Sequence, residues 1–160
     1  MIFGPYDPED CFQLEKCEIY KKIQNGIKIA EFVLYRNEQG TPIIFIVEAK
    51  SSAPIDLKQY CSEIELKLTN SLLLFLSLLH QRHHIPDFQL PKSLAGMKMS
   101  LIEFRFILII NNFNRKHLPP LTELLQSNLR RTLKLWHKSQ LLVLNHHGAL
   151  KRGLISGQVE

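Results

Sequence analysis

The sequence has little of what marks secreted, disulfide-bonded or membrane-spanning proteins. Its 160 residues include three cysteines (Cys11, Cys17 and Cys61), an odd number with no Cys-x-x-Cys pair. This pattern favours free thiols in a reducing, cytoplasmic setting. The longest apolar runs, around 72–79 and 106–110, are far too short to cross a bilayer. The amino end lacks the positive start and apolar stretch of a secretory signal, so we expect no membrane partner.

Motifs of several enzyme classes are missing as well. There is no Gly-rich phosphate loop, no Gly-x-Ser-x-Gly, and no Cys and His arrangement that indicates a nucleophile. With seven glycines, eight prolines and no internal repeat, the chain does not have a disordered or repetitive composition. Hydrophobic residues make up 45% and charged residues 22%, which predicts one globular domain spanning 1–160.

Positive charge is concentrated near the carboxyl end. Residues 111–160 contain eight Lys or Arg against two Glu, a net charge of +6, whereas residues 1–110 have a net charge of −1. A basic carboxyl-terminal third indicates a polyanionic partner such as nucleic acid.

The spacing of apolar residues predicts an α/β (α+β) fold with a mixed central sheet and flanking helices. The run at 42–50 is apolar without a break, which suits a buried central strand. Asp56 is a candidate N-cap, and apolar residues then recur at steps of four and three. The expected order is β-β-β-α-β-α-β: strands at 12–23, 27–35 and 42–50, a helix at 57–79, a loop at 83–98, a strand at 101–110, a helix from 119 to about 138 and a strand at 140–145.

The predicted strand at 42–50 ends with two charges. Its apolar residues run directly into Glu48 and Lys50. Residues two apart on a strand point to the same face, so both side chains project beside Ile44 and Ile46. An isolated buried charge is costly, and we therefore expect the pair at the strand's end, near water, a metal or each other.

A second carboxylate lies on the preceding predicted strand. Glu31 is the only charge on the face that it would share with Ile29 and Val33. Two carboxylates on neighbouring strands repel unless something positive lies between them. Lys50 meets part of that need, and Mg²⁺ would meet it better, because it binds a few carboxylate oxygens together with waters.

The segments AEFVLY and GTPIIFIVEAK, with the helix that follows, resemble the PD-(D/E)XK, or restriction-endonuclease-like, nuclease superfamily. The resemblance covers about 12–110 and implies a restriction-endonuclease-like core of order α-β-β-β-α-β. In that family an acid on one strand is followed by acid-x-Lys at the end of the next. Glu31 then corresponds to the first acid, where Asp is usual, Glu48 to the second and Lys50 to the lysine.

The resemblance also implies a chemistry. Glu31, Glu48 and the backbone carbonyl of Ala49 would hold Mg²⁺ or Mn²⁺ against a phosphodiester, and the cation would activate an attacking water. Lys50 would orient or help to deprotonate that water and offset negative charge at phosphorus.

Three further side chains are second-rank candidates. Glu18, on the first predicted strand, could supply another acid, and Gln59 and Glu63 on the predicted helix could support the site. A plain helix surface is the alternative for Gln59 and Glu63. Two other acid-x-Lys matches, at 56–58 and 65–67, lie on the same helix and are interpreted as solvated surface charges.

Four cations are candidates for binding nucleic acid. Arg130, Lys134 and Lys138 recur every four residues on the last predicted helix, with Arg131 beside them. Such a basic ridge could bind phosphates, or it could be an ordinary solvated helix face.

Together these patterns favour a metal-dependent nuclease that hydrolyses phosphodiester bonds, with DNA as the expected substrate. The alternatives are a nuclease-like fold that only binds nucleic acid, and a subunit of a larger complex. For Glu31, Glu48 and Lys50 themselves, the alternative is a surface ion network at the edge of the sheet. A single small domain of this kind could also work as a homodimer or with a partner subunit.

Overall fold

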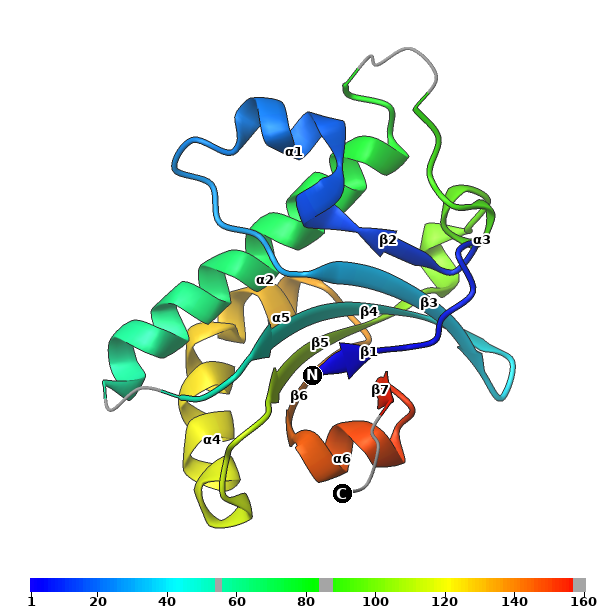
Figure 1. Ribbon diagram of the computed structural model, residues 1–160. Coiled ribbons are helices and arrows are strands. Elements are labelled where there is room, and N and C mark those ends of the chain that lie inside the picture. The colour runs from blue at the N-terminus through cyan, green and yellow to red at the C-terminus, as the bar shows by residue number, and fades with distance from the viewer. Residues whose placement is uncertain (54–55, 84–87, 157–160) are drawn as a thin grey trace.

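The computed structural model describes residues 1–53, 56–83 and 88–156. Within them a five-stranded sheet has the order β2-β3-β4-β5-β6, with helices on both faces (Figure 1). The first three strands are antiparallel neighbours, and the last two continue in parallel with β4. The predicted mixed α/β class is therefore confirmed. The strands are β2 (Cys11–Gln13), β3 (Phe32–Glu38), β4 (Thr41–Lys50), β5 (Glu103–Ile110) and β6 (Ser139–Asn145).

A tight hairpin joins β3 to β4. Gln39 and Gly40 form its turn with φ values of 53° and 84°. The side chain of Asn37 accepts a hydrogen bond from the Gly40 N–H at 2.9 Å. Glycine adopts the left-handed region without steric cost, which suits this two-residue connection. The turn and the buried strand after it lie where the sequence predicts them.

The helix α2 (Leu57–Leu79) connects β4 to β5 and covers one face of the sheet (Figure 1). Asp56 caps it, because its carboxylate accepts hydrogen bonds from the N–H groups of Lys58 at 3.0 Å and Gln59 at 3.1 Å. The apolar stripe of α2 packs on the inward-facing side chains of β4 and β5 in the larger core. The predicted cap and helix are confirmed.

Two shorter helices, α4 (Leu118–Asn128) and α5 (Arg130–Leu135), cover the same face beside α2. The sequence predicts one helix here, and this is wrong in part, because the helix breaks at Leu129 and ends before Lys138. The stripe of leucines continues across the break, so periodicity alone does not reveal it. The strand β6 follows close to its predicted position.

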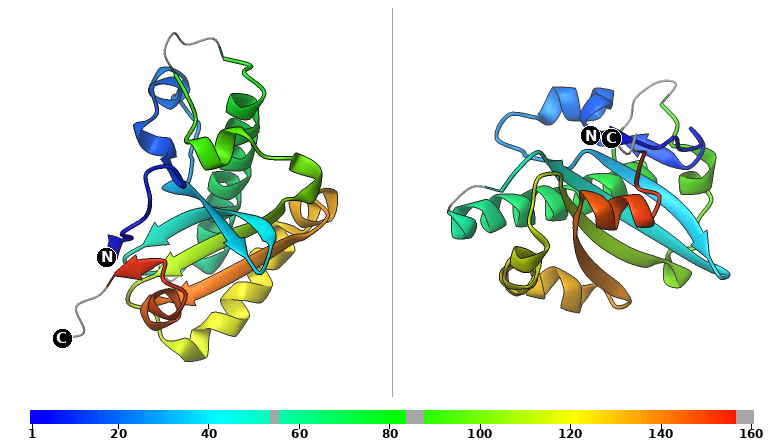
Figure 2. Two further views of the ribbon diagram at one scale, coloured as in Figure 1. Left: turned by 90° about the vertical axis from the view of Figure 1, so that its right-hand side faces the viewer. Right: turned by 60° about the horizontal axis from the view of Figure 1, so that its bottom comes forward.

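The opposite face of the sheet is covered by elements that the sequence does not predict. They are α6 (His146–Lys151) and a two-stranded ladder of β1 (Ile2–Phe3) and β7 (Ile155–Ser156), which brings the two ends of the described chain together (Figure 2). The guanidinium of Arg36 on β3 donates to the carbonyl oxygens of Arg152 and Gly153, each at 2.6 Å. These elements bury a second, smaller core.

The first predicted strand, at 12–23, is mostly wrong. After the short β2 the chain forms the 3-10 helix η1 (Leu14–Lys16) and the helix α1 (Glu18–Ile23). The buried residues Leu14 and Cys17 are three apart, which is a helical spacing. An interpretation based on strand alternation does not detect it. The second predicted strand is shorter than expected, since β3 begins at Phe32.

The predicted loop at 83–98 contains the short helix α3 (Lys92–Ala95), and its residues 84–87 lie outside the described part. Two 3-10 helices, η2 (Met99–Leu101) and η3 (Arg115–His117), flank β5. In the parts that the structure describes, none of the helices combines the length and the apolar character needed to cross a membrane.

Candidate functional site

Glu48 lies near the carboxyl end of β4, and its side chain is on the α2 face. Ile44 and Ile46, which share its face of the strand, belong to the core under α2. Glu48 is fully buried, with 0% exposure. Its Oε1 accepts a hydrogen bond from Lys67 Nζ at 2.8 Å and lies 3.2 Å from Lys50 Nζ. Glu48 and Lys50 thus lie together, as strand alternation predicts, and a second lysine joins them.

These three side chains form the Glu48 cluster (Glu48, Lys50 and Lys67). Burial raises the pKa of Glu48, and the hydrogen bond and charge of Lys67, followed by the charge of Lys50, oppose that rise. Burial alone would lower the pKa of Lys67, but the hydrogen bond and charge of Glu48 raise it overall. Two lysines therefore lie beside one buried carboxylate. A buried carboxylate needs such compensation of its charge.

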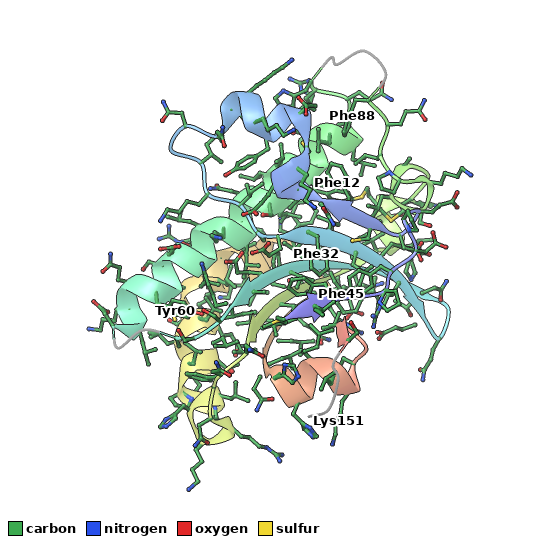
Figure 3. The ribbon with its side chains drawn as sticks, viewed as in Figure 1. Phe12, Phe32, Phe45, Tyr60, Phe88 and Lys151 are labelled. Atoms are coloured by element: carbon green, nitrogen blue, oxygen red, sulfur yellow. The ribbon has the colours of Figure 1, made fainter. Side chains whose placement is uncertain are left out.

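The other carboxylate oxygen of Glu48, Oε2, is buried. Among the described residues it has no hydrogen-bond partner, and neither has the buried hydroxyl of Tyr60. Tyr60 lies in the first turns of α2 (Figure 3). Burial, followed by the charge of Glu48, raises the pKa of Tyr60. Buried polar atoms normally bind a protein group, water or an ion, so this oxygen is suited to a further ligand.

Glu31 lies immediately before β3 and not within a strand as predicted. Its N–H donates to the Val47 carbonyl at 3.0 Å, and its carbonyl accepts from the Leu14 N–H at 3.2 Å. Burial, followed by the charges of Glu15 and Glu48, raises the pKa of Glu31. The carboxylates of Glu31 and Glu48 are thus coupled electrostatically from neighbouring segments.

A cavity of about 210 Å³ opens beside the end of β4, and Glu31 lines it. Ala49, Lys50 and Asn111 line it as well, together with Phe3 from the amino-terminal segment. Three of the four predicted central residues therefore share one cavity. Glu48 is not among the residues that line it.

The backbone carbonyl of Ala49 points away from β5. Carbonyls alternate in direction along a strand, and the Val47 carbonyl bonds to Glu31 N–H whereas the Lys50 carbonyl bonds to Asn111 N–H on the β5 side. The Ala49 carbonyl therefore points to the β3 side. Pairing between β3 and β4 begins only at Phe32 and Val47, so this carbonyl lies beyond the ladder.

Polar side chains from the ends of the other parallel strands extend this edge. Asn111 follows β5, and its Oδ1 lies 2.7 Å from His146 Nδ1 at the start of α6. The carboxyl ends of parallel strands are where α/β proteins commonly bind ligands.

Of the second-rank candidates, Glu63 lies in this network. Its Oε1 is 3.8 Å from Lys50 Nζ, and its Oε2 is 3.2 Å from Lys28 Nζ. Gln59 is exposed, and its recorded bond is the backbone donation to the Asp56 cap. Glu18 lies on α1, not on a strand, and is exposed beside Lys21 at 2.5 Å.

Lys67 is the main residue that the sequence interpretation missed. The match at 65–67 is not a pair of solvated charges, because the Lys67 side chain is only 13% exposed and binds Glu48. A signal was present: Lys67 is three residues after the buried Ile64 and four before the buried Ser71. Ser71 in turn donates to the Lys67 carbonyl and accepts from the Ala30 N–H, each at 2.7 Å.

The four predicted phosphate-binding cations are exposed, but they do not form one helical ridge. Arg130, Arg131 and Lys134 lie on α5, whereas Lys138 lies in the turn after it with a φ of 61°. None of the four lines the 210 Å³ cavity.

Among the described residues, no group of three or more His, Cys, Asp or Glu side chains is placed to hold a metal ion. The candidate donor set is smaller: two carboxylates and one carbonyl. All three cysteines are free thiols.

No protein-family model, curated protein or solved structure matches the chain.

Proposed function

We propose that this protein is a metal-dependent nuclease that hydrolyses phosphodiester bonds, with DNA as its substrate. One observation carries the proposal. Among the described residues, the buried Glu48 has a carboxylate oxygen without a hydrogen-bond partner, and its neighbours Ala49 and Lys50 line a cavity together with Glu31. A structural ion pair does not need the free oxygen, whereas a ligand-binding carboxylate does.

The donor set fits Mg²⁺ or Mn²⁺. Glu31, Glu48 Oε2 and the Ala49 carbonyl are oxygen donors, and Mg²⁺ commonly takes one or two carboxylates and keeps several waters. A bound cation would supply Lewis-acid stabilisation of the phosphate and a more acidic water. Glu48 would use Oε2, because Oε1 is bound to Lys67.

The residues of this chain have separable roles in that proposal. Lys67 fixes the Glu48 carboxylate and compensates part of its charge. Lys50, whose side chain is 28% exposed, is available to orient the attacking water and to offset charge on the phosphate. The water oxygen would bond to phosphorus and lose one proton to solvent, and the ester oxygen would leave with the bonding electron pair and take up one proton from solvent.

Cleavage assays test this proposal directly. Purified protein is incubated with plasmid and with labelled oligonucleotides in Mg²⁺ or Mn²⁺, and then with EDTA. We expect cation-dependent cutting that falls by at least about 100-fold in Lys50→Ala and in Glu48→Gln. The controls are Lys58→Ala and Glu123→Gln, which change exposed residues of the same types. Cutting that survives Lys50→Ala contradicts the assignment.

A second candidate function is nucleic-acid binding without catalysis. Two lysines already compensate Glu48, so the cluster can persist without a cation, and the exposed Arg130, Arg131, Lys134 and Lys138 could bind phosphates. Binding through phosphates weakens steeply with salt. Nucleic-acid affinity that barely changes with salt would count against this candidate.

A further inference from the structure

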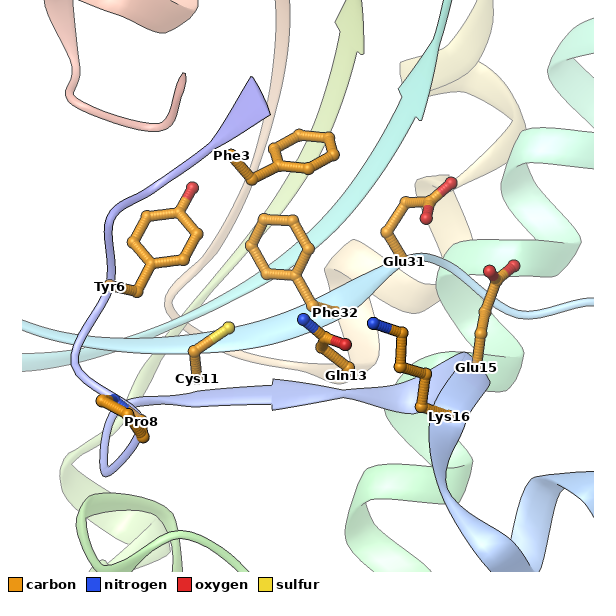
Figure 4. A pocket seen from close by; sticks show the side chains of 9 residues that line it. All are labelled: Phe3, Tyr6, Pro8, Cys11, Gln13, Glu15, Lys16, Glu31 and Phe32. Atoms are coloured by element: carbon orange, nitrogen blue, oxygen red, sulfur yellow. The ribbon is translucent and has the colours of Figure 1, made fainter. Parts of the chain in front are cut away.

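A larger cavity, of about 500 Å³, lies next to the candidate site (Figure 4). Its aromatic wall consists of Phe3, Tyr6 and Phe32, with ring centroids of Phe3 and Tyr6 at 5.1 and 5.4 Å from that of Phe32. Gln13, Lys16 and two carboxylates, Glu15 and Glu31, form its polar side. Small-molecule sites measure roughly 300–1,000 Å³, so this cavity can hold a group the size of a nucleoside.

The two cavities are adjacent. Phe3 and Glu31 line both of them, and beyond these two residues the smaller cavity presents Lys50 and Asn111. A group in the larger cavity would therefore lie next to whatever the smaller cavity binds. If the smaller cavity takes a phosphate, the neighbouring group along a nucleic-acid strand is a sugar with its base.

We infer that the aromatic cavity binds an unpaired nucleobase of the substrate strand while the adjacent phosphate occupies the smaller cavity. The inference rests on the proposed nuclease function and specifies its substrate as single-stranded nucleic acid, an unpaired end, or a base turned out of a duplex. A base that is paired and stacked within a duplex cannot enter a cavity of this kind.

The chemistry of the lining fits a base. Aromatic side chains stack on bases of any sequence, and the Gln13 amide can donate and accept hydrogen bonds along a base edge. The base is neutral, so Glu31 does not repel it. The phosphate, which carries the negative charge, would lie in the smaller cavity, which Lys50 lines.

The aromatic wall is held in place by the folded chain. Phe3 pairs with Ile155 in the ladder between β1 and β7, and the Tyr6 hydroxyl donates to the Leu154 carbonyl. Binding would not have to order these side chains, which favours affinity.

Binding is tested first without a metal, using deoxyadenosine monophosphate as the probe in EDTA and saturation-transfer NMR as the readout. We expect transfer of saturation from the protein to the base protons. Affinity should be about tenfold weaker in Phe3→Leu, which removes a stacking surface, and in Gln13→Ala, which removes the hydrogen-bonding amide. The matched controls are Phe88→Leu, an aromatic residue that packs against Phe12 elsewhere, and Gln126→Ala, an exposed amide on α4. Both controls should bind as the wild type does.

The second measurement compares cleavage of one labelled sequence as a single strand and as a blunt duplex. We expect faster cutting of the single strand and loss of that preference in Phe3→Leu and Gln13→Ala. Metal-dependent cutting with equal rates on both substrates, unchanged in these variants, overturns the inference and leaves the nuclease proposal intact. Nucleotide binding that depends on Phe3 and Gln13, without any cutting, supports the cavity and overturns the nuclease proposal. Absence of nucleotide binding in the wild type overturns the inference.

Discussion

Two charged clusters lie at opposite ends of the central strands, and they stabilise their charges differently. The Arg105 cluster (Arg105, Glu38 and Glu103) lies where β5 begins. Arg105 Nη1 is 2.7 Å from Glu38 Oε2, and its Nε is 3.0 Å from Glu103 Oε1. The guanidinium also lies 5.5 Å from the ring centroid of Phe45. The Glu48 cluster lies at the carboxyl end of β4, where Glu48 is fully buried and the Lys50 side chain is 28% exposed.

The two clusters differ in how far their carboxylates are exposed to solvent and in whether each carboxylate oxygen has a hydrogen-bond partner. Glu38 is 42% exposed, so water solvates what Arg105 leaves open, and neither carboxylate of that cluster is among the buried unpaired atoms of the described residues. Glu48 has no exposure, and its Oε2 has no hydrogen-bond partner in the described part of the chain. The Arg105 cluster is complete without a ligand, as a surface ion network is, whereas the Glu48 cluster retains a costly open position. This contrast is the basis for our proposal that the Glu48 cluster, and not the Arg105 cluster, binds a ligand.

The largest expected effect is on stability at the Glu48 cluster. Lys67→Met removes the closest cation of a fully buried carboxylate, and we expect a loss of about 3 kcal/mol in the free energy of unfolding. Urea denaturation measures it, with Lys58→Met, an exposed position of the same helix, as the control at about 0.5 kcal/mol or less. Arg105→Met should cost less than Lys67→Met, because Glu38 reaches water.

A double variant sharpens this result. Glu48→Gln combined with Lys67→Met removes the buried charge along with its partner, so we expect it to recover at least half of the stability lost in Lys67→Met. A double variant as unstable as the sum of the two single ones would show that Lys67 acts by packing and not by charge.

The next effect is stabilisation by a divalent cation. At a hundredfold excess over its Kd, Mg²⁺ should raise the free energy of unfolding by about 2.7 kcal/mol. Glu31→Gln and Glu48→Gln should abolish this gain, and Glu38→Gln and Glu103→Gln should retain it. Calorimetric scans with and without Mg²⁺ provide the measurement. An equal gain in all four variants would place the cation elsewhere.

A smaller effect depends on pH. Burial, followed by the charges of Glu15 and Glu48, raises the pKa of Glu31 in the folded chain. As pH rises, the unfolded chain loses its proton first, so the fold loses stability between the unfolded and the folded pKa. Glu31→Gln cannot ionise and should be more stable than the wild type at about pH 7 and equal to it at about pH 3.5. Urea denaturation at both pH values checks this, with Glu123→Gln as an exposed control. An equal difference at both values contradicts the raised pKa.

The central part of the fold was predictable because several sequence signals agree there. The apolar run of β4, the Asp56 cap and the stripe along α2 each indicate the same element. The segment before β3 was not, because its buried residues are few and their spacing fits a strand and a helix about equally. The ladder of β1 and β7 joins segments about 150 residues apart, and two-residue strands have no periodicity to detect.

Within the site, the sequence predicted only which side chains of one strand lie on the same face. Alternation places Glu48 beside Lys50, since both lie on one strand, but Lys67 reaches Glu48 from a helix whose rotation against the sheet is set by the packing of the whole core. The unpaired Oε2 is likewise a property of the surrounding packing and has no counterpart in sequence. The role of Glu31, Glu48 and Lys50 in a reaction remains a prediction.

The smallest expected effect is the one that most directly separates the two clusters. Glu103→Gln removes one partly exposed partner of Arg105, and Glu38 still compensates the guanidinium. Partly exposed pairs contribute about 0–1 kcal/mol, so urea denaturation should show a change within that range, and DNA cleavage should not change. Glu48→Gln at the other end of the sheet should instead abolish cleavage. If Glu103→Gln lowers cleavage as much as Glu48→Gln does, the open carboxylate oxygen is not what distinguishes the site, and both clusters act only by supporting the sheet.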